Sequence, residues 1–455
     1  GREPVELAPR VTLERRGLNR YAFRQAGETI EVDLNLAPGE WYLPPYQLPP
    51  RTIQREFFSV VHTGEGDGWN PRRPCMASLL CHQGRLYLID AGPGITHTLD
   101  ALGITANEID GIFQTHGHDD HFAGLTCLAR ADHRIAYYAA PPVRASVERK
   151  LCALMDMDVA RFAESFEVID LPLDAWTSLR GLEVMPVAAP HPVDNTVMLF
   201  RALGPAGFRT YAHLADIPSL RVLDRMVTDD PSASGVTSDY RDRFRTFLRA
   251  PADVKKVDVG GGFIHGEAVD FIGDPSGRLL LSHTSAPLTP EERAVGPMAE
   301  FGEADVLIRA GNDAETIERA LRYLGDYFPA VPRHELEVLA HCPVAVHEAG
   351  SELVTAGTVR EEVLFILAGI VEARDPAGGP THRLSAGALI GEITAIAGEP
   401  ARRTHVATSE VTALCIPLAT CREFIRRNGL FEELLHLREL RQFLESTPLF
   451  ADTIS

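Results

Sequence analysis

The sequence has few cysteines, no long hydrophobic run and no surplus of positive charge, and each shortage excludes a class of protein. Seven cysteines in 455 residues are an odd number, and no two of them form a CxxC pair. This usage indicates reduced thiols rather than a disulfide framework. No apolar run approaches the roughly 18 to 20 residues of a membrane-spanning helix, and the N-terminus lacks a signal-peptide core. We therefore expect a cytoplasmic protein.

Positive charge is scarce as well. The chain has 44 lysines and arginines against 63 aspartates and glutamates, which gives a net charge of -19. Proteins that bind long nucleic acid usually present a basic face, so we expect neither long nucleic acid nor a membrane among the partners. The hydrophobic content of 45 % can fill a core, and the length favours two or three domains.

Four segments follow one another along the chain. Residues 1–56 are rich in proline, as in LPPYQLPP, and predict an extended N-terminal arm. Residues 57–310 alternate short apolar runs with helical and loop segments. Residues 311–334 place apolar side chains at helical spacing behind Asp313, a plausible N-cap, and predict a linker helix. Residues 335–455 return to short strands with glycine turns before a final helical stretch.

Four apolar runs in residues 57–310 share one layout. Each has the length of a strand and ends in aspartate or histidine followed by turn residues. The runs are GRLYLIDAGPG (84–94), GIFQTHGHDDH (111–121), RTYAHLADIP (209–218) and GRLLLSHTSAP (277–287). Their polar groups are therefore expected at the carboxyl ends of strands on one rim of a sheet, where α/β folds place their chemistry.

The run HGHDDH crowds five possible metal ligands into six positions. In an extended segment residues i and i+2 point the same way, so His116 and His118 can bind one ion. Asp120 and His121, at the start of a following helix, point to a second ion. A single metal ion would leave several of these strong ligands uncoordinated, so we predict two metal ions. Further donors follow other strands: His191, Asp216 and His283.

This order of motifs resembles the metallo-β-lactamase fold superfamily. The resemblance covers roughly residues 57–310 and implies an α/β fold of the αββα sandwich type. It assigns one metal to His116, His118 and His191, and the other to Asp120, His121 and His283. It makes Asp216 the bridge between the metals, with His213 as a weaker competitor. It also makes Asp90 a carboxylate that orients the HxHxDH loop, while Asp119 is expected to face solvent or a supporting partner.

Two divalent ions sharing a hydroxide provide a nucleophile at neutral pH and polarise the electrophile, which suits hydrolysis. We expect zinc, with manganese or iron as alternatives. The catalytic residues are taken as Asp120, through its metal, and His265. Superfamily members that cleave phosphodiesters keep a histidine or glutamate near VDVGGGFIHGEAVDF (257–271) to assist the leaving group, and His265 matches it. The alternative is that the glycines make a tight bend that His265 caps.

Residues from about 335 to 445 resemble a cyclic-nucleotide-binding domain. The resemblance implies a β jelly-roll barrel with C-terminal helices, in which IGEITAI begins the phosphate-binding cassette and RRT ends it. In such a cassette, backbone amides and an arginine bind the cyclic phosphate and a glutamate accepts from the ribose hydroxyl. The residues assigned in this way are Gly391, Glu392, Ile393, Arg402, Arg403 and Thr404.

Two arginines compete for the phosphate. Counting back four residues from Val406 selects Arg402, whereas the RRT pattern of channel-type cassettes selects Arg403 followed by Thr404. The family usually has Pro-Arg at this place, and the sequence here reads EPARR instead. The loop therefore has one extra residue or a shifted register, and a barrel that only mediates contacts is the alternative.

Together the two resemblances predict a dinuclear metallohydrolase, a phosphodiesterase acting on a small or cyclic nucleotide and regulated by cAMP or cGMP at the barrel. The alternatives are a thioester, lactone or other ester hydrolase under the same control, a tRNA-processing nuclease, and a non-hydrolytic di-iron sensor. The charge of -19 disfavours the nuclease. A glutamate in place of His118 would have favoured redox iron chemistry.

The sequence LFEELLHLRELRQFLESTPLF (430–450) carries a narrow apolar seam: Leu430, Leu434, Leu437, Leu440 and Leu444. Such a seam suits either a helix docked on the barrel or a two-stranded coil. We expect a homodimer whose turnover changes when nucleotide binds. The end of the chain, FLESTPLFADTIS (443–455), resembles the opening of a further sensory module and leaves open a longer parent protein.

Overall fold

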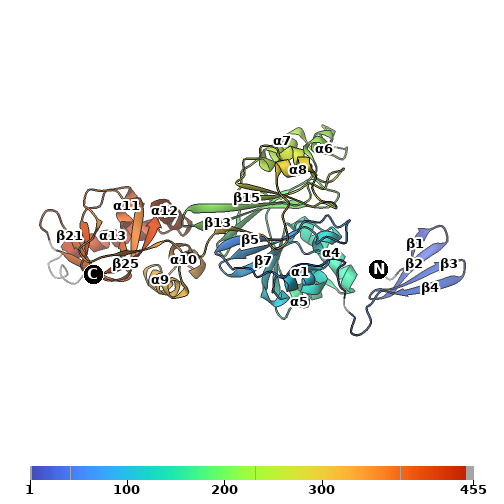
Figure 1. Ribbon diagram of the computed structural model, residues 1–455, viewed down its shortest axis with the longest axis horizontal. Coiled ribbons are helices and arrows are strands. Elements are labelled where there is room, and N and C mark those ends of the chain that lie inside the picture. The colour runs from blue at the N-terminus through green and yellow to red at the C-terminus, as the bar shows by residue number, and fades with distance from the viewer. Residues whose placement is uncertain (1–2, 41, 231, 380, 447–455) are drawn as a thin grey trace. The chain divides into compact units, whose positions relative to one another are not determined.

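The computed structural model describes residues 3–40, 42–230, 232–379 and 381–446 (Figure 1). The chain forms two compact units. The first comprises residues 1–177, 183–200 and 210–307, and the second comprises residues 178–182, 201–209 and 308–455. Among the described residues, no helix has both the length and the apolar content needed to cross a bilayer.

Residues 5–33 form an antiparallel sheet, so the extended arm expected over residues 1–56 is wrong for this part. Its strands are β1 (Val5–Ala8), β2 (Val11–Gly17), β3 (Arg20–Gln25) and β4 (Glu28–Asp33), hydrogen-bonded in that order. Tight reversals at Asn19 and Gly27, both with positive φ, connect β2 to β3 and β3 to β4. The prolines that suggested an arm lie mostly after the sheet, between residues 38 and 50.

Two sheets form the body of the first unit. The first sheet runs in the order β10 (Phe166–Asp170), β9 (Ile135–Ala139), β8 (Ile109–Phe113), β7 (Arg85–Ile89), β6 (Ala77–His82), β5 (Phe58–Gly64) and β17 (Ala304–Ile308). The second runs β11 (Thr177–Leu179), β12 (Leu182–Ala188), β13 (Thr196–Gly204), β14 (Gly207–Leu214), β15 (Val254–Asp258) and β16 (Arg278–Ser282). The turn between β13 and β14 is grouped with the second unit.

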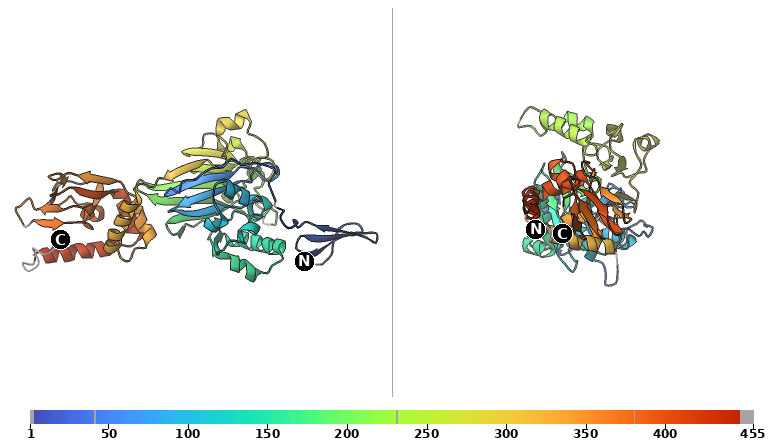
Figure 2. Two further views of the ribbon diagram at one scale, coloured as in Figure 1. Left: turned by 60° about the horizontal axis from the view of Figure 1, so that its bottom comes forward. Right: turned by 90° about the vertical axis from the view of Figure 1, so that its left-hand side faces the viewer.

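Helices cover the outer faces of both sheets, which gives the αββα sandwich that was expected (Figures 1 and 2). The first sheet is covered by α1 (Ile95–Ala101), α3 (Leu125–Leu128), α4 (Pro141–Met155) and α5 (Val159–Ser165), with the short α2 (Asp119–Phe122) at its edge. The second is covered by α6 (Leu220–Arg225), α7 (Ser238–Leu248) and α8 (Pro290–Val295). Two short 3-10 turns are Ala106–Glu108 and Ala268–Phe271. Each helical layer encloses a core with its sheet.

Between the sheets lie aromatic rings and one buried ammonium group. Phe113 of β8 packs edge-on against Phe200 of β13, with ring centroids 4.9 Å apart. Lys256 of β15 is fully buried, and its Nζ donates to the carbonyls of Gly64 (2.8 Å) and Ala77 (2.7 Å) in the first sheet. Such a group is tolerated in a core because its hydrogen bonds are satisfied there.

The strand directions bring the polar strand ends together. β8 is parallel to β7, and β15 is parallel to both β14 and β16, so within each sheet the carboxyl ends share one edge. The predicted donors follow these ends directly: Asp90 follows β7, the HxHxDH loop follows β8, His191 follows β12, Asp216 follows β14 and His283 follows β16.

The second unit contains a β barrel of two four-stranded sheets. One sheet is β18 (Val344–His347), β25 (Val411–Pro417), β20 (Glu362–Ala368) and β23 (Leu389–Ile390), and the other is β19 (Glu352–Val354), β24 (Thr404–Ala407), β21 (Val371–Arg374) and β22 (His382–Leu384). The helices are α9 (Ala314–Tyr327), α10 (Arg333–Ala340), α11 (Glu392–Ala397), α12 (Leu418–Arg427) and α13 (Phe431–Ser446).

The segment 311–334 differs from the linker helix that was expected. Leu321 and Leu324 of α9 are buried in the same core as Phe365 of β20 and Phe424 of α12, so α9 is an integral part of the second unit.

The leucine seam of α13 is partly buried and partly exposed. Leu430 and Leu434 belong to that core, Leu437 and Leu440 are exposed, and the side chain of Leu444 lies outside the described residues.

We predict that Leu324→Ala destabilises the second unit by about 2 to 5 kcal/mol, because it opens a cavity in a packed core. Scanning calorimetry of the full chain should show the same transition lowered by Leu324→Ala and by Leu414→Ala in β25. The control Leu437→Ala changes an exposed leucine and should stay within about 0.5 kcal/mol. If Leu324→Ala left the unfolding transition of the second unit unchanged, α9 would be a linker that does not pack in this core.

Candidate metal centre

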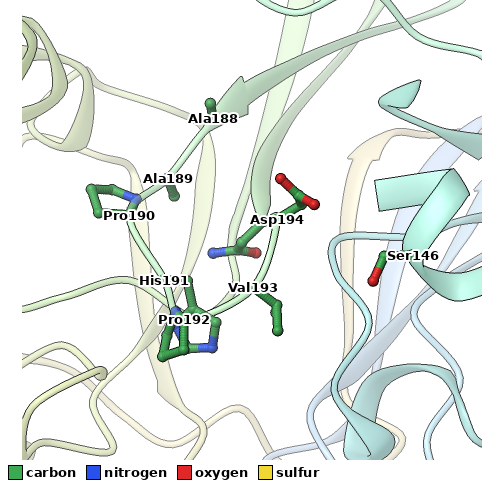
Figure 3. A pocket seen from close by; sticks show the side chains of 9 residues that line it. Ser146, Ala188, Ala189, Pro190, His191, Pro192, Val193 and Asp194 are labelled. Atoms are coloured by element: carbon green, nitrogen blue, oxygen red, sulfur yellow. The ribbon is translucent and has the colours of Figure 1, made fainter. Parts of the chain in front are cut away.

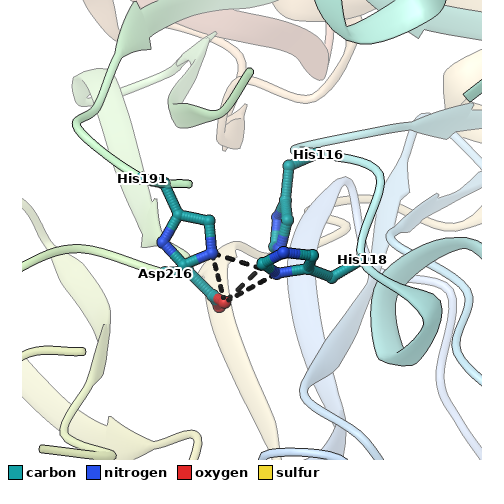
Figure 4. A group of neighbouring side chains, drawn as sticks. All are labelled: His116, His118, His191 and Asp216. Atoms are coloured by element: carbon teal, nitrogen blue, oxygen red, sulfur yellow. Dashed lines mark hydrogen bonds and ion pairs between the residues drawn. The ribbon is translucent and has the colours of Figure 1, made fainter. Parts of the chain in front are cut away.

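The loops at the strand ends bring histidine and aspartate side chains together in two groups, and a third group that overlaps both comprises Asp216, Asp258, His265 and His283. In the first group, the ligand atoms of His116, His118, His191 and Asp216 all lie within 4.8 Å of one another (Figure 4). In the second group, the same holds for Asp120, His121 and His283. These seven residues are the metal ligands that the sequence predicted.

The first group surrounds one oxygen of Asp216. His116 Nε2 and His191 Nε2 each lie 3.3 Å from Asp216 Oδ2, and His118 Nδ1 lies 3.9 Å from it. His191 Nε2 is 3.0 Å from His118 Nδ1. His116 comes straight from β8 and is fully buried, whereas the His118 side chain is 30 % exposed, so the group opens toward solvent on the side of His118.

The second group faces the other oxygen of the same carboxylate. His121 Nε2 and His283 Nε2 each lie 3.2 Å from Asp216 Oδ1. Asp120 Oδ2 lies 3.2 Å from His121 Nε2 and 3.4 Å from His283 Nε2. Asp216 is only 1 % exposed and presents one oxygen to each group, which is the position of a bridging ligand.

The spacing of these atoms fits metal binding. Tetrahedral bonds of about 2.0 to 2.1 Å place neighbouring ligand atoms about 3.3 Å apart, and the distances within both groups scatter around that value. His116 Nε2 and Asp216 Oδ1 are buried without a hydrogen-bond partner. Buried polar atoms are rarely left in that state, so the donor set fits a cation in each group.

Asp90 supports the second group, as the resemblance implied. Its carboxylate is fully buried and accepts from His121 Nδ1 (2.8 Å), from the Thr115 backbone N (2.8 Å) and hydroxyl (2.6 Å), and from Gln114 Nε2 (2.9 Å). The hydrogen bond to Nδ1 fixes the ring and leaves Nε2 of His121 facing Asp120 and Asp216.

Asp258, at the end of β15, is a supporting residue that the sequence reasoning missed. Its Oδ1 lies 3.2 Å from His283 Nδ1, and its Oδ2 lies 3.1 Å from His265 Nδ1. It therefore lies within ion-pair distance of His283 Nδ1, without a hydrogen bond of the kind that Asp90 makes with His121. The signal was present, because VDVGGG also ends a strand-length run in aspartate and turn residues. Only His265 was taken from that stretch.

His265 belongs to the overlapping third group, with Asp216, Asp258 and His283. Its ring centroid is 4.7 Å from that of His283, and its Nδ1 is 3.8 Å from Asp216 Oδ2. His213, considered from the sequence as an alternative to Asp216, and Asp119 of the HGHDDH run contact other partners. His213 Nδ1 bonds to the Tyr211 hydroxyl at 2.9 Å, and the exposed Asp119 pairs with Lys150 at 3.0 Å.

Two residues of the centre have a strained backbone. Asp90 has a φ of 62° and His283 a φ of 61°, in the left-handed region that glycine adopts freely and that aspartate and histidine enter more often than most other residues. Such a conformation costs on the order of 1 kcal/mol for each residue and persists only where surrounding contacts hold it.

Burial and the neighbouring carboxylates shift the pKa values of the histidines in the centre. Burial lowers the pKa of His191 to about 3 and also lowers the pKa of His116, so these imidazoles are neutral and able to bind a metal. Burial would lower the pKa of His121 too, but the neighbouring carboxylates of Asp120, Asp216 and Asp90 outweigh it and raise that pKa. The site therefore attracts positive charge, which a proton or a metal ion can supply.

The predicted nucleotide cassette lies in the second unit. Gly391, with a φ of 98°, caps the start of α11, and Glu392 is the first residue of that helix. Arg402 Nη2 pairs with Glu399 Oε2 at 3.0 Å. Thr404 begins β24, and its hydroxyl accepts from the Ala356 backbone N at 3.1 Å. The Ile393 side chain lies outside the described residues.

The chain matches two family models. Residues 70–193 match the metallo-beta-lactamase superfamily, and residues 345–428 match the cyclic nucleotide-binding domain. Ribonuclease Z of Treponema pallidum strain Nichols is 33 % identical over 92 residues, which are 19 % of this chain and 30 % of that protein. The chain thus spans less than a third of the length of this relative.

Solved structures resemble each unit. The metallo-beta-lactamase fold protein YhfI from Bacillus subtilis covers 55 % of this chain and 98 % of its own, at 16 % identity and a TM-score of 0.41. The regulatory domain of Toxoplasma gondii PKA, crystallised with cAMP, covers 30 % of this chain and 53 % of its own, at 17 % identity and a TM-score of 0.25. The two family matches show a metallo-beta-lactamase domain in the first unit and a cyclic nucleotide-binding domain in the second.

Proposed function

We propose that the first unit is a dinuclear metal-dependent hydrolase. The observation that carries this proposal is the position of Asp216, which presents Oδ2 to His116, His118 and His191 and Oδ1 to His121 and His283. A carboxylate shared in this way suits two cations rather than one. When bound, divalent ions supply Lewis acidity and a nucleophile derived from water at neutral pH. Zinc suits these ligands first, and manganese or iron also suit them.

The residues around the metals orient ligands and move a proton. Asp90 holds His121 by a hydrogen bond to Nδ1, and Asp258 faces Nδ1 of His283 at 3.2 Å. The hydrogen bond from His265 Nδ1 to Asp258 orients the ring. In the imidazolium form Nε2 carries a second proton, which would pass to the leaving oxygen and leave the neutral ring hydrogen-bonded to Asp258.

We propose a phosphodiester as the substrate, in a small or cyclic nucleotide. The local identity to ribonuclease Z favours a phosphodiester, and the cyclic nucleotide-binding domain favours a nucleotide signal as the regulator. Cleavage of RNA is the second candidate because of that same relative, and the net charge of -19 weighs against it.

We also propose that cAMP or cGMP binds at the cassette from Gly391 to Thr404 and changes turnover in a homodimer. The chain offers a direct connection. β13 begins next to Asn195 and β14 ends two residues before Asp216. Residues 201–209, which are the end of β13, the turn and the start of β14, belong to the second unit. Regulation through such a connection requires that nucleotide binds two states with different affinity.

The metal content of the protein tests the dinuclear centre. We expect about two ions per chain by elemental mass spectrometry after dialysis. Asp216→Ala should lower the content and reduce hydrolysis of bis(p-nitrophenyl) phosphate at least 100-fold, because both groups lose a ligand. The matched control Asp119→Ala removes a neighbouring exposed carboxylate and should keep both metal and activity. A fully active protein with one ion, or an active Asp216→Ala protein, would contradict the centre.

The role of His265 is tested with a series of leaving groups. A general acid matters most when the leaving oxygen is basic. His265→Ala should therefore slow alkyl phosphodiesters on the order of 100-fold or more, and p-nitrophenyl esters only a few-fold. The slope of log kcat/KM against leaving-group pKa measures the difference. An unchanged slope would remove His265 from the proton transfer.

Calorimetry with cAMP and cGMP tests the cassette. The full chain with Asp216→Ala, which cannot consume the ligand, should bind at least one of them. Adding Glu392→Ala, or Arg402→Ala together with Arg403→Ala, should weaken binding about 10-fold or more through loss of charge-assisted hydrogen bonds. The control Arg383→Ala lies on β22, exposed and outside the cassette, and should leave affinity unchanged. Failure of the Asp216→Ala protein to bind either nucleotide would make the barrel structural.

A further inference from the structure

Besides the open depression that residues 188–195 and Ser146 line next to the first metal group (Figure 3), the first unit has a second surface feature, at its N-terminus. The antiparallel sheet β1–β4 has one apolar face and one charged face. Its strand pairing aligns four apolar side chains in one row across the sheet: Val5, Leu13, Phe23 and Ile30. Residues two positions away along a strand face the same side, and they add Val11, Tyr21 and Val32 to this apolar face.

The opposite face of the sheet is charged, and its charges pair with one another. Arg24 and Arg16 lie 3.0 Å and 2.9 Å from the carboxylate of Glu14. Arg20 lies 3.0 Å from Asp33. An antiparallel sheet commonly turns a polar face to water and packs its other face against a core. The charged face is therefore the solvent side, and the apolar face is the side that lacks its usual cover.

The apolar face is exposed. Val5 is 58 % exposed, Phe23 37 % and Ile30 64 %, and Leu7, at the irregularity in β1, is 54 % exposed. Figures 1 and 2 show the four strands as a single layer. Domains bury the apolar face of a sheet against a second layer, and contiguous exposed apolar patches mark interaction surfaces. Within the described part of the chain, no second layer covers these four side chains.

The charge of this segment differs from that of the whole chain. Residues 5–33 contain five arginines and five aspartates or glutamates and are therefore neutral, whereas the chain carries a net charge of -19. A neutral surface does not attract an anionic bilayer or a polyanion. It also does not repel a second copy of this acidic chain, as most of the remaining surface would.

The two charged residues at strand positions of the apolar face lie at its opposite ends. Glu28 pairs with Gln25 next to the β3–β4 turn, and Arg15 pairs with Tyr21 toward the β2–β3 turn. Arg15 also donates to the backbone carbonyls of Ala153 and Leu154 in α4, and these neutral acceptors leave its charge uncompensated. A second copy laid on this face with its strands reversed brings the Glu28 end of each copy over the Arg15 end of the other.

We propose that the apolar face of β1–β4 binds the same face of a second copy of this chain about a two-fold axis. The product is a β sandwich with both charged faces outside. Four strands about 4.8 Å apart, with about six residues of 3.3 Å each, give a footprint of about 400 Å² per copy. Such an area lies at the low end for specific interfaces, so we expect a dissociation constant in the micromolar range. The inference gives the proposed homodimer a surface and does not depend on hydrolysis.

Sedimentation velocity of the full chain at about 1 to 100 µM should show a reversible equilibrium between monomer and dimer. Ile30→Arg places a charge in the apolar face and should raise the dissociation constant about 10-fold or more. The matched control Thr29→Arg places the same charge on the neighbouring position of β4, on the charged face, and should leave the constant within about twofold. Both positions are exposed, so both variants should fold.

A second pair of variants tests the orientation of the two copies. Glu28→Lys sets like charges against the Arg15 end of the other copy and should raise the dissociation constant several-fold. Glu31→Lys makes the same charge change in the same strand, on the charged face, and should leave the constant unchanged. Equal effects of the two variants would overturn the reversed arrangement.

Several results would overturn the interface itself. These are a strict monomer at about 100 µM, a variant Ile30→Arg that dimerises as well as Thr29→Arg, and a dimer that responds only to Leu437→Arg on the exposed part of α13. Flotation with vesicles of phosphatidylcholine, with and without phosphatidylserine, tests a bilayer as the occupant. Vesicle binding by a monomeric chain that is lost in Ile30→Arg would assign the face to a membrane instead. No substrate enters these measurements, so a failure of this interface leaves the hydrolase proposal standing, and the reverse also holds.

Discussion

A single buried carboxylate dictates much of the first unit. Asp216 is 1 % exposed and lies within 4 Å of the ligand nitrogens of five histidines. A charge in that position is tolerated only where other groups compensate it. The compensation comes from histidines that follow three different strands, β8, β12 and β16. The parallel strand pairs that align those ends are therefore a requirement of the centre as well as a property of the sheet.

The second metal group is flanked by a carboxylate from each sheet. Asp90 in the first sheet accepts a hydrogen bond from His121 Nδ1, and Asp258 in the second lies 3.2 Å from His283 Nδ1. Each carboxylate is also anchored by backbone amides, Asp90 by Thr115 and Asp258 by Ile217 and Gly260. The orientation of the ligands is thus tied to the main chain of both sheets, so that a shift between the sheets would disturb the centre.

Local patterns were sufficient for some features of this protein and insufficient for others. The dense HGHDDH run and the strand-end histidines predicted which side chains meet, and both family resemblances are confirmed by the family matches. The roles of the individual ligands stay predictions. Asp258 was missed because its importance lies in contacts with His265 and His283, which no local pattern displays. The sheet at residues 5–33 was missed because proline-rich neighbours concealed its tight turns. α9 was taken as a linker because periodicity shows that a helix has an apolar face, but not what covers that face.

The left-handed backbone of Asp90 and His283 has an evolutionary consequence. Glycine would adopt this backbone at either position without strain. It would also remove the buried Asp90 carboxylate, which accepts from Thr115 and Gln114, and the His283 ring beside Asp216. The identity of positions 90 and 283 in other descendants of this sequence thus reports whether selection still maintains the site.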